Sequence, residues 1–319
     1  MTDPVRSNLA LFVIGTGPTS DTRQQSSSGI HYTVITGLVL STTCLAIRLL
    51  TRHQILRKIT AEDLCLTIAW GFCVGTQIVI LYALDHAGLG HHIEYLSVQT
   101  ISTYEKLFLT AACLFITGIC LARLAHLVLF HRLMIAKSWL RHALYGVTAF
   151  VIIGSITLVF CFIFACRPIS KAWDVTLQGQ CINRPAILVA VAVLNIISDF
   201  LLILLPIPVI SDLQVPRSQK IKTFIILVMV CITFVASAIR LRFTVPLLSS
   251  SDLTYKIAPV ALLVGVESNL IIITATLPAL KQFLFILVSK LGLVSVGSDL
   301  LKACSRTQED TNSHDFGAP

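Results

Sequence analysis

The stretch GICLARLAHLVLFHRLM, residues 118–134, decides the fold, because it is an apolar helical segment that carries a charge. Arg123 stands among Leu, Ala, Ile and Cys, and His126 follows three residues later on the same helix face. An ionisable residue at such depth in a bilayer is costly and usually faces the interior of a helix bundle. The alternative is that Arg123 snorkels, with its stem leading the charged head toward the lipid headgroups.

The composition supports a membrane protein. The chain has 319 residues, of which 55% are hydrophobic and 13% charged, whereas soluble domains carry about 25% charged residues. The composition therefore argues strongly against a water-soluble fold. The net charge of +8 does not indicate a nucleic-acid partner, because the basic residues lie in short loops, where membrane topology explains them. The ten cysteines lie mostly in apolar runs, without metal-ligand spacing, so we expect neither a metal nor a cofactor.

Seven apolar runs are long enough to cross a bilayer, which takes about 20 residues of helix. They are residues 31–50, 64–84, 107–130, 143–165, 186–210, 221–243 and 257–280. The sequence therefore predicts an all-α, polytopic membrane protein with a seven-transmembrane helix bundle over residues 30–285. Residues 1–29 are predicted to be a polar, flexible segment, and residues 286–319 a tail that is largely disordered at its end. The lipid bilayer is the one partner that this pattern requires.

Lysine and arginine in the short loops predict the orientation. The loops after the first, third and fifth spans hold nine of them: Arg52, Arg57, Lys58, Arg132, Lys137, Arg141, Arg217, Lys220 and Lys222. The opposite loops hold five: Lys106, Arg167, Lys171, Arg184 and Lys256. The N-terminus should lie outside and the C-terminus in the cytosol, in the plasma membrane or the endoplasmic reticulum.

Arg123 has a candidate partner in the fifth span. Asn195 and Asp199 are four residues apart, so they share one helix face. The third and fifth spans run in the same direction, and Asp199 falls at about the depth of Arg123. We therefore predict a buried Arg123–Asp199 pair with Asn195 as a hydrogen-bonding neighbour. The other interpretation gives Asp199 a role with a substrate or a proton.

A second buried acid, Glu267, lies near the middle of the seventh span. Arg240 and Arg242, near the outer end of the sixth span, are the basic groups best placed in depth to meet it. Both arginines also suit an interfacial anchoring role. The seventh span, 257–280, contains no lysine, so it offers no attachment point for a retinal Schiff base.

Two cysteines flank the loop between the fourth and fifth spans. Cys166 and Cys181 are 15 residues apart, on the predicted outer side. A disulfide closing such a loop contributes about 3 kcal/mol. Two free thiols, or a bridge to Cys113 in the third span, are the alternatives.

A series of residues and short motifs occurs in a characteristic order along the chain. They are Glu62, Asp63, GLGHH at 88–92, Arg123, Phe130, Arg132, Cys166, Pro168, Trp173, Cys181, Asn195, Asp199, LPIP at 205–208, Lys220, Arg240, Glu267 and Pro278. In these features, over about residues 30–285, the chain resembles the fungal rhodopsin-domain family of integral membrane proteins, which includes receptor-like proteins and members encoded in mycotoxin gene clusters such as the satratoxin cluster. Arg123 stands where the family usually has lysine, and Leu64 and Phe130 also depart from its usual residues. The resemblance implies seven helices and a fungal origin, while the family's activities are largely unassigned.

Three functions compete. The first is a receptor-like or accessory membrane protein, encoded in a secondary-metabolite cluster, that binds a small apolar molecule between its helices and meets a partner at its basic cytosolic loops. The second is a membrane-embedded cyclase or hydrolase in which Asp199 or Glu267 acts as a buried acid. A transporter comes third, because no inverted repeat or pair of broken helices is visible.

Overall fold

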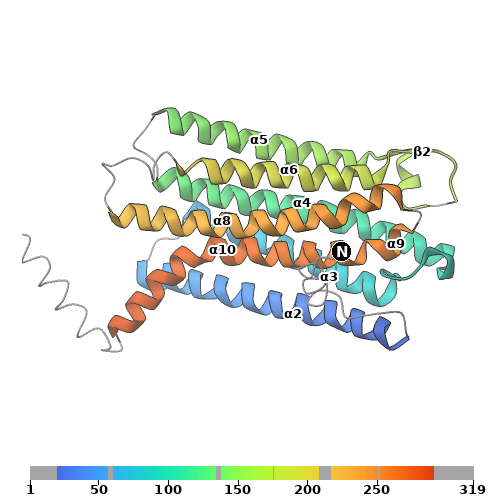
Figure 1. Cartoon of the computed structure of the whole chain (residues 1–319), viewed down its shortest axis with the longest axis horizontal. Coiled ribbons are helices and arrows are strands. Elements are labelled where there is room, and N and C mark those ends of the chain that lie inside the picture. Colours follow the sequence, from blue (N-terminus) through green and yellow to red (C-terminus); the bar gives the residue numbers. More distant parts are fainter. Residues whose placement is uncertain are drawn as a thin grey trace, which may run out of the picture.

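The computed structural model describes residues 20–56, 60–133, 138–174, 176–207, 217–250 and 252–290. Its long helices lie roughly side by side along the longest axis of the molecule (Figure 1). They are α2 (Ser20–Leu50), α3 (Ala61–His86), α4 (Val98–Leu133), α5 (Ser138–Ile163), α6 (Arg184–Leu204), α8 (Arg217–Thr244) and α10 (Ala258–Lys290). Within these ranges, seven helices are long and apolar enough to span a membrane, as the sequence predicts.

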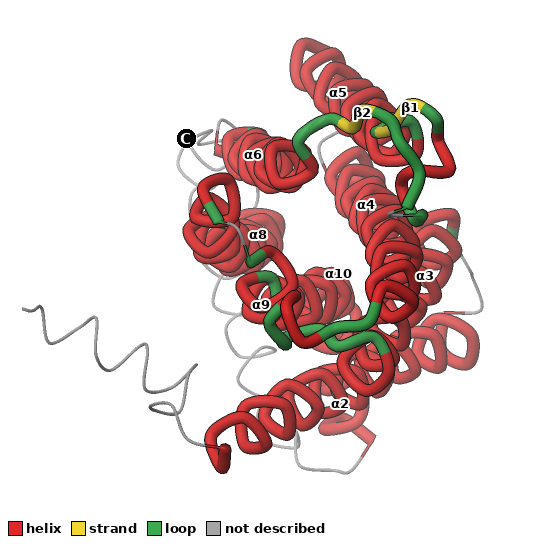
Figure 2. The backbone as a smooth tube through the Cα atoms, turned by 90° about the vertical axis from the view of Figure 1, so that its right-hand side faces the viewer, coloured by secondary structure: helices red, strands yellow, loops and turns green. Residues whose placement is uncertain are grey.

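The seven helices form a closed ring in which each packs against its neighbours in the chain. The ring closes where α10 packs against α2, and α10 also contacts α3 and α4 across the bundle. Figure 2 shows this arrangement from the end where the strands β1 and β2 lie. Large apolar side chains such as Val39 and Ile153 are exposed on the outside of the ring, as expected for a surface that faces lipid.

The short elements lie mostly at one end. A two-stranded antiparallel ladder joins β1 (Cys166–Arg167) to β2 (Gln180–Cys181), with Cys166 opposite Cys181. The 3-10 helices η2 (Ile93–Tyr95), η3 (Ile169–Ala172) and η4 (Val245–Ser249) and the short helix α9 (Leu253–Lys256) complete this end, which we call the disulfide end. At the opposite end, the π-helical turn η1 (Thr51–Leu56) follows α2, and α3 begins.

Several helices differ in length from the predicted spans. Helix α4 begins at Val98 instead of 107, because its polar first turns extend beyond the apolar run. Helix α6 begins at Arg184, with Pro185 in its first turn, and ends at Leu204, before the two prolines of LPIP. Helix α2 begins at Ser20, inside the segment predicted to be flexible, and α10 continues to Lys290. The predicted terminal segments at 1–19 and 291–319 lie outside the described residues.

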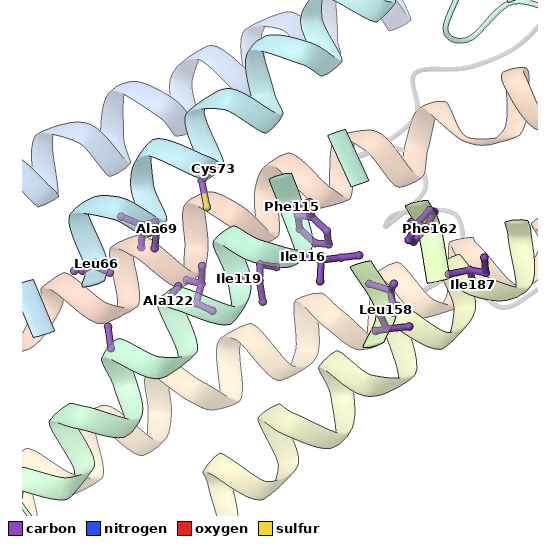
Figure 3. Close-up of a cluster of buried hydrophobic side chains, with 14 of the residues drawn as sticks. Leu66, Ala69, Cys73, Phe115, Ile116, Ile119, Ala122, Leu158, Phe162 and Ile187 are labelled. Atoms are coloured by element: carbon purple, nitrogen blue, oxygen red, sulfur yellow. The ribbon is translucent and has the colours of Figure 1, made fainter. Parts of the chain in front are cut away.

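The core is apolar and tightly packed between α3 and α4. Figure 3 shows Leu66, Ala69 and Cys73 of α3 beside Ile119 and Ala122 of α4. The two helices come close at Gly118, where an added Cβ would lie 3.1 Å from the Cβ of Phe72 and 3.3 Å from the sulfur of Cys73. This close approach fixes the depth at which α4 presents Arg123.

Candidate functional site

Arg123 lies inside the bundle, where it pairs with α6. Its Nη2 donates to the Oδ1 of Asp199 at 2.9 Å and to the backbone oxygen of Asn195 at 2.9 Å, and its Nη1 donates to the Oδ1 of Asn195 at 2.7 Å. Only 2% of Arg123 and 1% of Asp199 is exposed. The predicted pair is confirmed, and the snorkelling alternative is wrong.

Glu267 of α10 pairs with α8. The Nη1 of Arg240 lies 2.9 Å from the Oε2 of Glu267, and both side chains are buried. The guanidinium carbon of Arg240 also lies 4.9 Å from the centre of the Phe115 ring, which is a cation–π contact. Of the two arginines considered from the sequence, Arg240 is therefore the partner of Glu267, whereas Arg242 is exposed.

Ser237 joins these two ion pairs, and sequence reasoning missed it. Its hydroxyl oxygen lies 2.8 Å from the Oδ2 of Asp199 and 2.9 Å from the Oε1 of Glu267. Arg123, Asn195, Asp199, Ser237, Arg240 and Glu267 thus form one buried cluster on α4, α6, α8 and α10, which we call the core polar network. Two arginines and two acids balance its charge. The available signal was the spacing of Ser237, three residues before Arg240 on one helix face.

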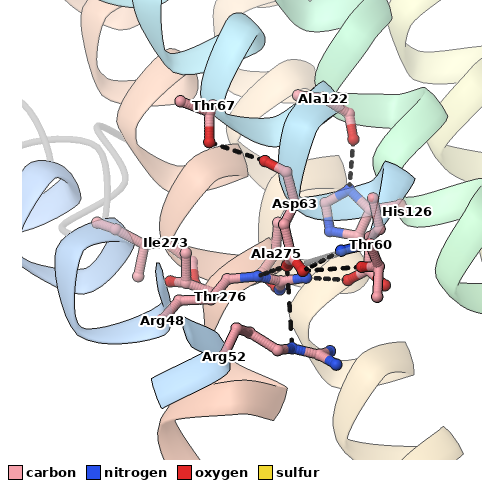
Figure 4. A network of polar contacts seen from close by, with 11 residues as sticks. Arg48, Arg52, Thr60, Asp63, Thr67, Ala122, His126, Ile273, Ala275 and Thr276 are labelled. Carbon is pink, nitrogen blue, oxygen red and sulfur yellow. Dashed lines mark hydrogen bonds and ion pairs between the residues drawn. The ribbon is translucent and has the colours of Figure 1, made fainter. Parts of the chain in front are cut away.

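A second buried cluster lies toward the opposite end (Figure 4). Arg48 of α2 uses all three of its nitrogens: Nε donates to the Oδ1 of Asp63 at 2.8 Å, Nη2 to Glu62, and Nη1 to the backbone oxygen of Ala275. Asp63 also accepts hydrogen bonds from the backbone N–H and the hydroxyl of Thr60, at 3.2 and 2.8 Å, and so caps α3. The sequence marked Glu62 and Asp63 only by family resemblance, and Arg48 was missed.

His126 lies beside the Arg48 cluster (Figure 4) and also interacts electrostatically with Arg123. Its Nδ1 lies 3.1 Å from the carbonyl oxygen of Ala122. A carbonyl only accepts, so the hydrogen is on Nδ1 and Nε2 is left as an acceptor. Nε2 has no hydrogen-bond partner in the part of the chain that the structure describes. His126 therefore neighbours both buried clusters without joining either by a side-chain hydrogen bond.

A cavity of about 90 Å³ lies in the half of the bundle toward the disulfide end. Arg240 is the one charged side chain among the described residues that line it, so the core polar network reaches the cavity only through this guanidinium. The full lining is Thr76, Val79, Ile80, Ala83, Leu89, Tyr104, Leu107, Phe108, Ala111, Ala112, Phe115, Ile116, Phe162, Leu188, Val191, Arg240, Thr244, Ile257, Val260, Ala261 and Val264. Such an arrangement, apolar walls with few polar groups, is typical of a small-molecule site.

The disulfide end is tied together beside this cavity. Cys166 and Cys181 form a disulfide, as predicted, and Cys113 is a free thiol. Arg184 pairs with Glu105 of α4 and donates from Nη2 to the backbone oxygen of Ala172 at 2.6 Å. The loop between β1 and β2 is therefore fixed to α4 and α6, which both contribute side chains to the cavity wall.

No group of three or more His, Cys, Asp or Glu side chains within the described residues is placed to hold a metal ion. The candidate functional groups among these residues are the buried ion pairs and the cavity.

The chain matches known proteins along most of its length. Residues 47–285 match the model of the fungal rhodopsin domain. The Fugralins biosynthesis cluster protein 2 of Gibberella zeae is 25% identical over 80% of this chain and 65% of its own length. The Polyenoic acids biosynthesis gene cluster protein Ba17b of Metarhizium anisopliae is 26% identical over 55% of this chain and 49% of its own.

A SAT4 family membrane protein of Emericella nidulans is 27% identical over 56% of this chain and 47% of its own length. The chain thus spans about half to two thirds of the curated relatives that it matches. No solved structure gives a significant match. The family match covers most of the membrane bundle, including both buried clusters, and on this evidence the chain is a multi-pass membrane protein that belongs to the fungal rhodopsin domain family.

Proposed function

We propose that this chain is a receptor-like or accessory membrane protein of fungal secondary metabolism, which holds a small apolar molecule in the cavity. The observation that carries the proposal is the cavity itself, whose walls are apolar apart from Arg240 and a few hydroxyl groups. The relatives named as biosynthesis cluster proteins support the metabolic setting.

The position of Arg240 suits a receptor-like role. Arg240 pairs with Glu267, and Glu267 is joined through Ser237 to Asp199, so an occupant that touches Arg240 contacts one member of this network. These residues belong to α6, α8 and α10, so an occupant that repositions the guanidinium changes contacts between three helices. A ligand shifts a conformational equilibrium only by its differential affinity for the two states, and Arg240 is a group through which that difference can arise.

A membrane-embedded cyclase or hydrolase is the alternative, and the geometry favours it less. An acid that protonates a substrate must reach the reacting atom. Asp199 and Glu267 each face an arginine at 2.9 Å, and neither belongs to the described lining of the cavity. Binding needs no rearrangement of these pairs, whereas acid catalysis does.

We also propose that the disulfide end faces outside and the opposite end the cytosol, where the basic loops would meet a protein partner. The excess of Lys and Arg in the loops of the opposite end and the disulfide between Cys166 and Cys181 support this orientation. A cysteine introduced at Leu177 should react with an impermeant maleimide in intact cells after the native thiols are replaced, and one introduced at 214 should not. The reverse pattern would contradict the orientation.

Binding can be tested through the molecules that purify with the protein. The chain is expressed in a fungal host, transferred to lipid nanodiscs and extracted for mass spectrometry. Ala112→Phe fills the cavity wall on α4, and Ala190→Phe places the same side chain at an exposed site on α6. A small apolar compound should accompany the unsubstituted protein and Ala190→Phe but not Ala112→Phe. Equal recovery from all three would contradict the proposal, and recovery of a chemically altered compound would support the enzyme.

A further inference from the structure

We infer that the turn GLGHH, residues 88–92, is a gate at the disulfide end of the cavity, through which the occupant enters from the aqueous side. In this gate Leu89 is the plug, Gly88 and Gly90 are the hinges on either side of it, and His92 is the latch that holds the turn on α9. The inference rests on the proposed function, because it describes how the proposed occupant reaches the cavity.

One part of the cavity wall lies outside the long helices. Of the described residues that line the cavity, all but Leu89 and Ile257 belong to α3, α4, α5, α6, α8 or α10. Leu89 lies in the turn that follows α3, and Ile257 lies between α9 and α10. Only 7% of Leu89 is exposed, so its side chain packs into the wall at the disulfide end. Moving this part of the wall requires no separation of membrane-spanning helices.

Glycines flank Leu89 on both sides. Gly88 has a φ of +68° and Gly90 a φ of +88°, values in the left-handed region that glycine adopts without strain. At Gly88 an added Cβ would also collide with the side chain of Leu96. Lids move at a few loop residues that absorb changes in backbone angle. A change in the backbone angles of these two glycines moves Leu89 away from the cavity while α3 stays in place.

Contacts with α9 and the residue before it hold the turn in place. The N–H of Gly90 donates to the backbone oxygen of Thr254 at 3.0 Å. The Nδ1 of His92 lies 3.3 Å from the Oδ2 of Asp252, and the His92 ring stacks on Tyr255 with the ring centres 4.4 Å apart. The side chains of His92 and Asp252 are 38% and 33% exposed, and contacts between exposed side chains are individually weak. This latch is therefore weaker than the buried ion pairs of the bundle, as a gate requires.

The test measures how fast a thiol inside the cavity reacts. The full chain is placed in lipid nanodiscs, with the cysteines outside the Cys166–Cys181 disulfide replaced by alanine. Ala112→Cys then places one thiol on the cavity wall, and in a separate variant Ala190→Cys places one at an exposed site on α6. Methylmercury chloride, a small neutral reagent that bonds to a thiol through mercury, is added, and mass spectrometry follows the rate of modification.

The first variant opens the gate. His92→Ala removes both side-chain contacts of the latch and should speed the reaction of the cavity thiol about fivefold to tenfold, because the open fraction of the turn rises. His91→Ala, at the neighbouring exposed histidine, is the matched control and should leave the rate unchanged. The exposed thiol of Ala190→Cys should react at the same rate in both backgrounds.

The second variant holds the gate closed. An added Cβ at Gly90 would lie 3.6 Å from the Cβ of Ala258, which is a suitable separation for a disulfide. Gly90→Cys combined with Ala258→Cys should slow the reaction of the cavity thiol about tenfold or more, because the bridged turn no longer reaches its open state. Mass spectrometry of non-reduced peptides first verifies the bridge. The comparison of His92→Ala with His91→Ala tests the inference even where the bridge does not form.

Hydrogen exchange reports whether the turn itself opens. The N–H of Gly90 is bonded to Thr254 in the closed turn, so it exchanges with deuterium only when this contact breaks. In His92→Ala its exchange should speed up by about the same factor as the reaction of the cavity thiol, because both follow the same opening. A faster thiol reaction with unchanged exchange at Gly90 would overturn the gate.

The remaining outcomes decide between two routes of entry. If His92→Ala does not change the rate at the cavity thiol, the gate is overturned and the reagent enters between the helices, out of the bilayer. A cavity thiol that reacts in none of the variants would also overturn the gate. Neither result bears on the proposed function, because recovery of an apolar compound with and without Ala112→Phe tests binding in the cavity by itself.

Discussion

Arg48 and Arg240 are both buried arginines, but their surroundings differ. Arg48 donates from all three nitrogens to groups of the protein: two carboxylates and a backbone carbonyl. Arg240 pairs with one carboxylate from one nitrogen and leaves two others without a partner among the described residues, on the wall of a cavity. All three nitrogens of Arg48 are therefore paired at the end of the bundle where α3 begins, which we call the closed end, whereas Arg240 is only partly paired in the core polar network.

The largest effect should come from the closed end. Arg48→Leu leaves Glu62 and Asp63 buried without their main cationic partner, since Arg52 lies 3.9 Å from Asp63. We expect a loss in free energy of unfolding of about 5 kcal/mol, the upper end for breaking a buried pair. Arg240→Leu isolates one acid and should cost about 3 kcal/mol. Thermal unfolding in detergent measures both, with exposed Arg242→Leu as the control. An equal or larger loss in the free energy of unfolding for Arg240→Leu would contradict the contrast between the two arginines.

A double-mutant cycle tests whether Arg123 and Asp199, in the core polar network, depend on one another as buried ion pairs do. Arg123→Leu or Asp199→Leu alone should cost about 3–5 kcal/mol, because each leaves its buried partner unpaired. The double variant should cost much less than the sum, since neither charge then remains. Additive losses, measured by the same unfolding experiment, would show that the two side chains do not depend on one another.

Removing the disulfide should have a smaller effect, confined to the cavity end. Replacing Cys166 and Cys181 together by serine should cost about 3 kcal/mol, the expected contribution of a cross-link over a loop of this length. Reductant should destabilise the unsubstituted protein by a similar amount and leave the double variant unchanged. Cys161→Ser, at an exposed free thiol, is the matched control. A response of the double variant to reductant would contradict the assignment of the effect to this bond.

The same contrast explains what the sequence could predict. The Arg123–Asp199 pair follows from two regular helices, because residue number converts to depth when helices run in the same direction. Arg48 was missed because Glu62 and Asp63 lie at the start of an apolar run, where acids are usually interfacial. In the structure both acids are buried, and this burial decides their role. The cavity was not predictable in detail. Phe108 on its wall and Leu66 in the core are equally apolar, and only the packing of several helices leaves space beside one of them.

Ser237 should give the smallest effect and the sharpest test of the shared network. Its hydroxyl carries one hydrogen and lies within 2.9 Å of both Asp199 and Glu267, so it donates fully to only one carboxylate at a time. Ser237→Ala removes this donor between two acids and should cost about 1–2 kcal/mol. Ser198→Ala, at a buried serine whose hydroxyl donates to the backbone oxygen of Leu194 on its own helix, should cost less.

The decisive quantity is the energetic coupling of Ser237 to Arg240 and to Arg48. In the Ser237→Ala background, the loss caused by Arg240→Leu should differ from its value in the unsubstituted protein, because Ser237 contacts Glu267 directly. The loss caused by Arg48→Leu should stay the same within error, because Arg48 bonds to Glu62, Asp63 and Ala275 and not to the network. Additivity with Arg240→Leu would mean that Ser237 only fills space. Coupling to Arg48→Leu would mean that the Arg48 cluster and the core polar network unfold as one unit. The contrast between Arg48 and Arg240 would then no longer hold.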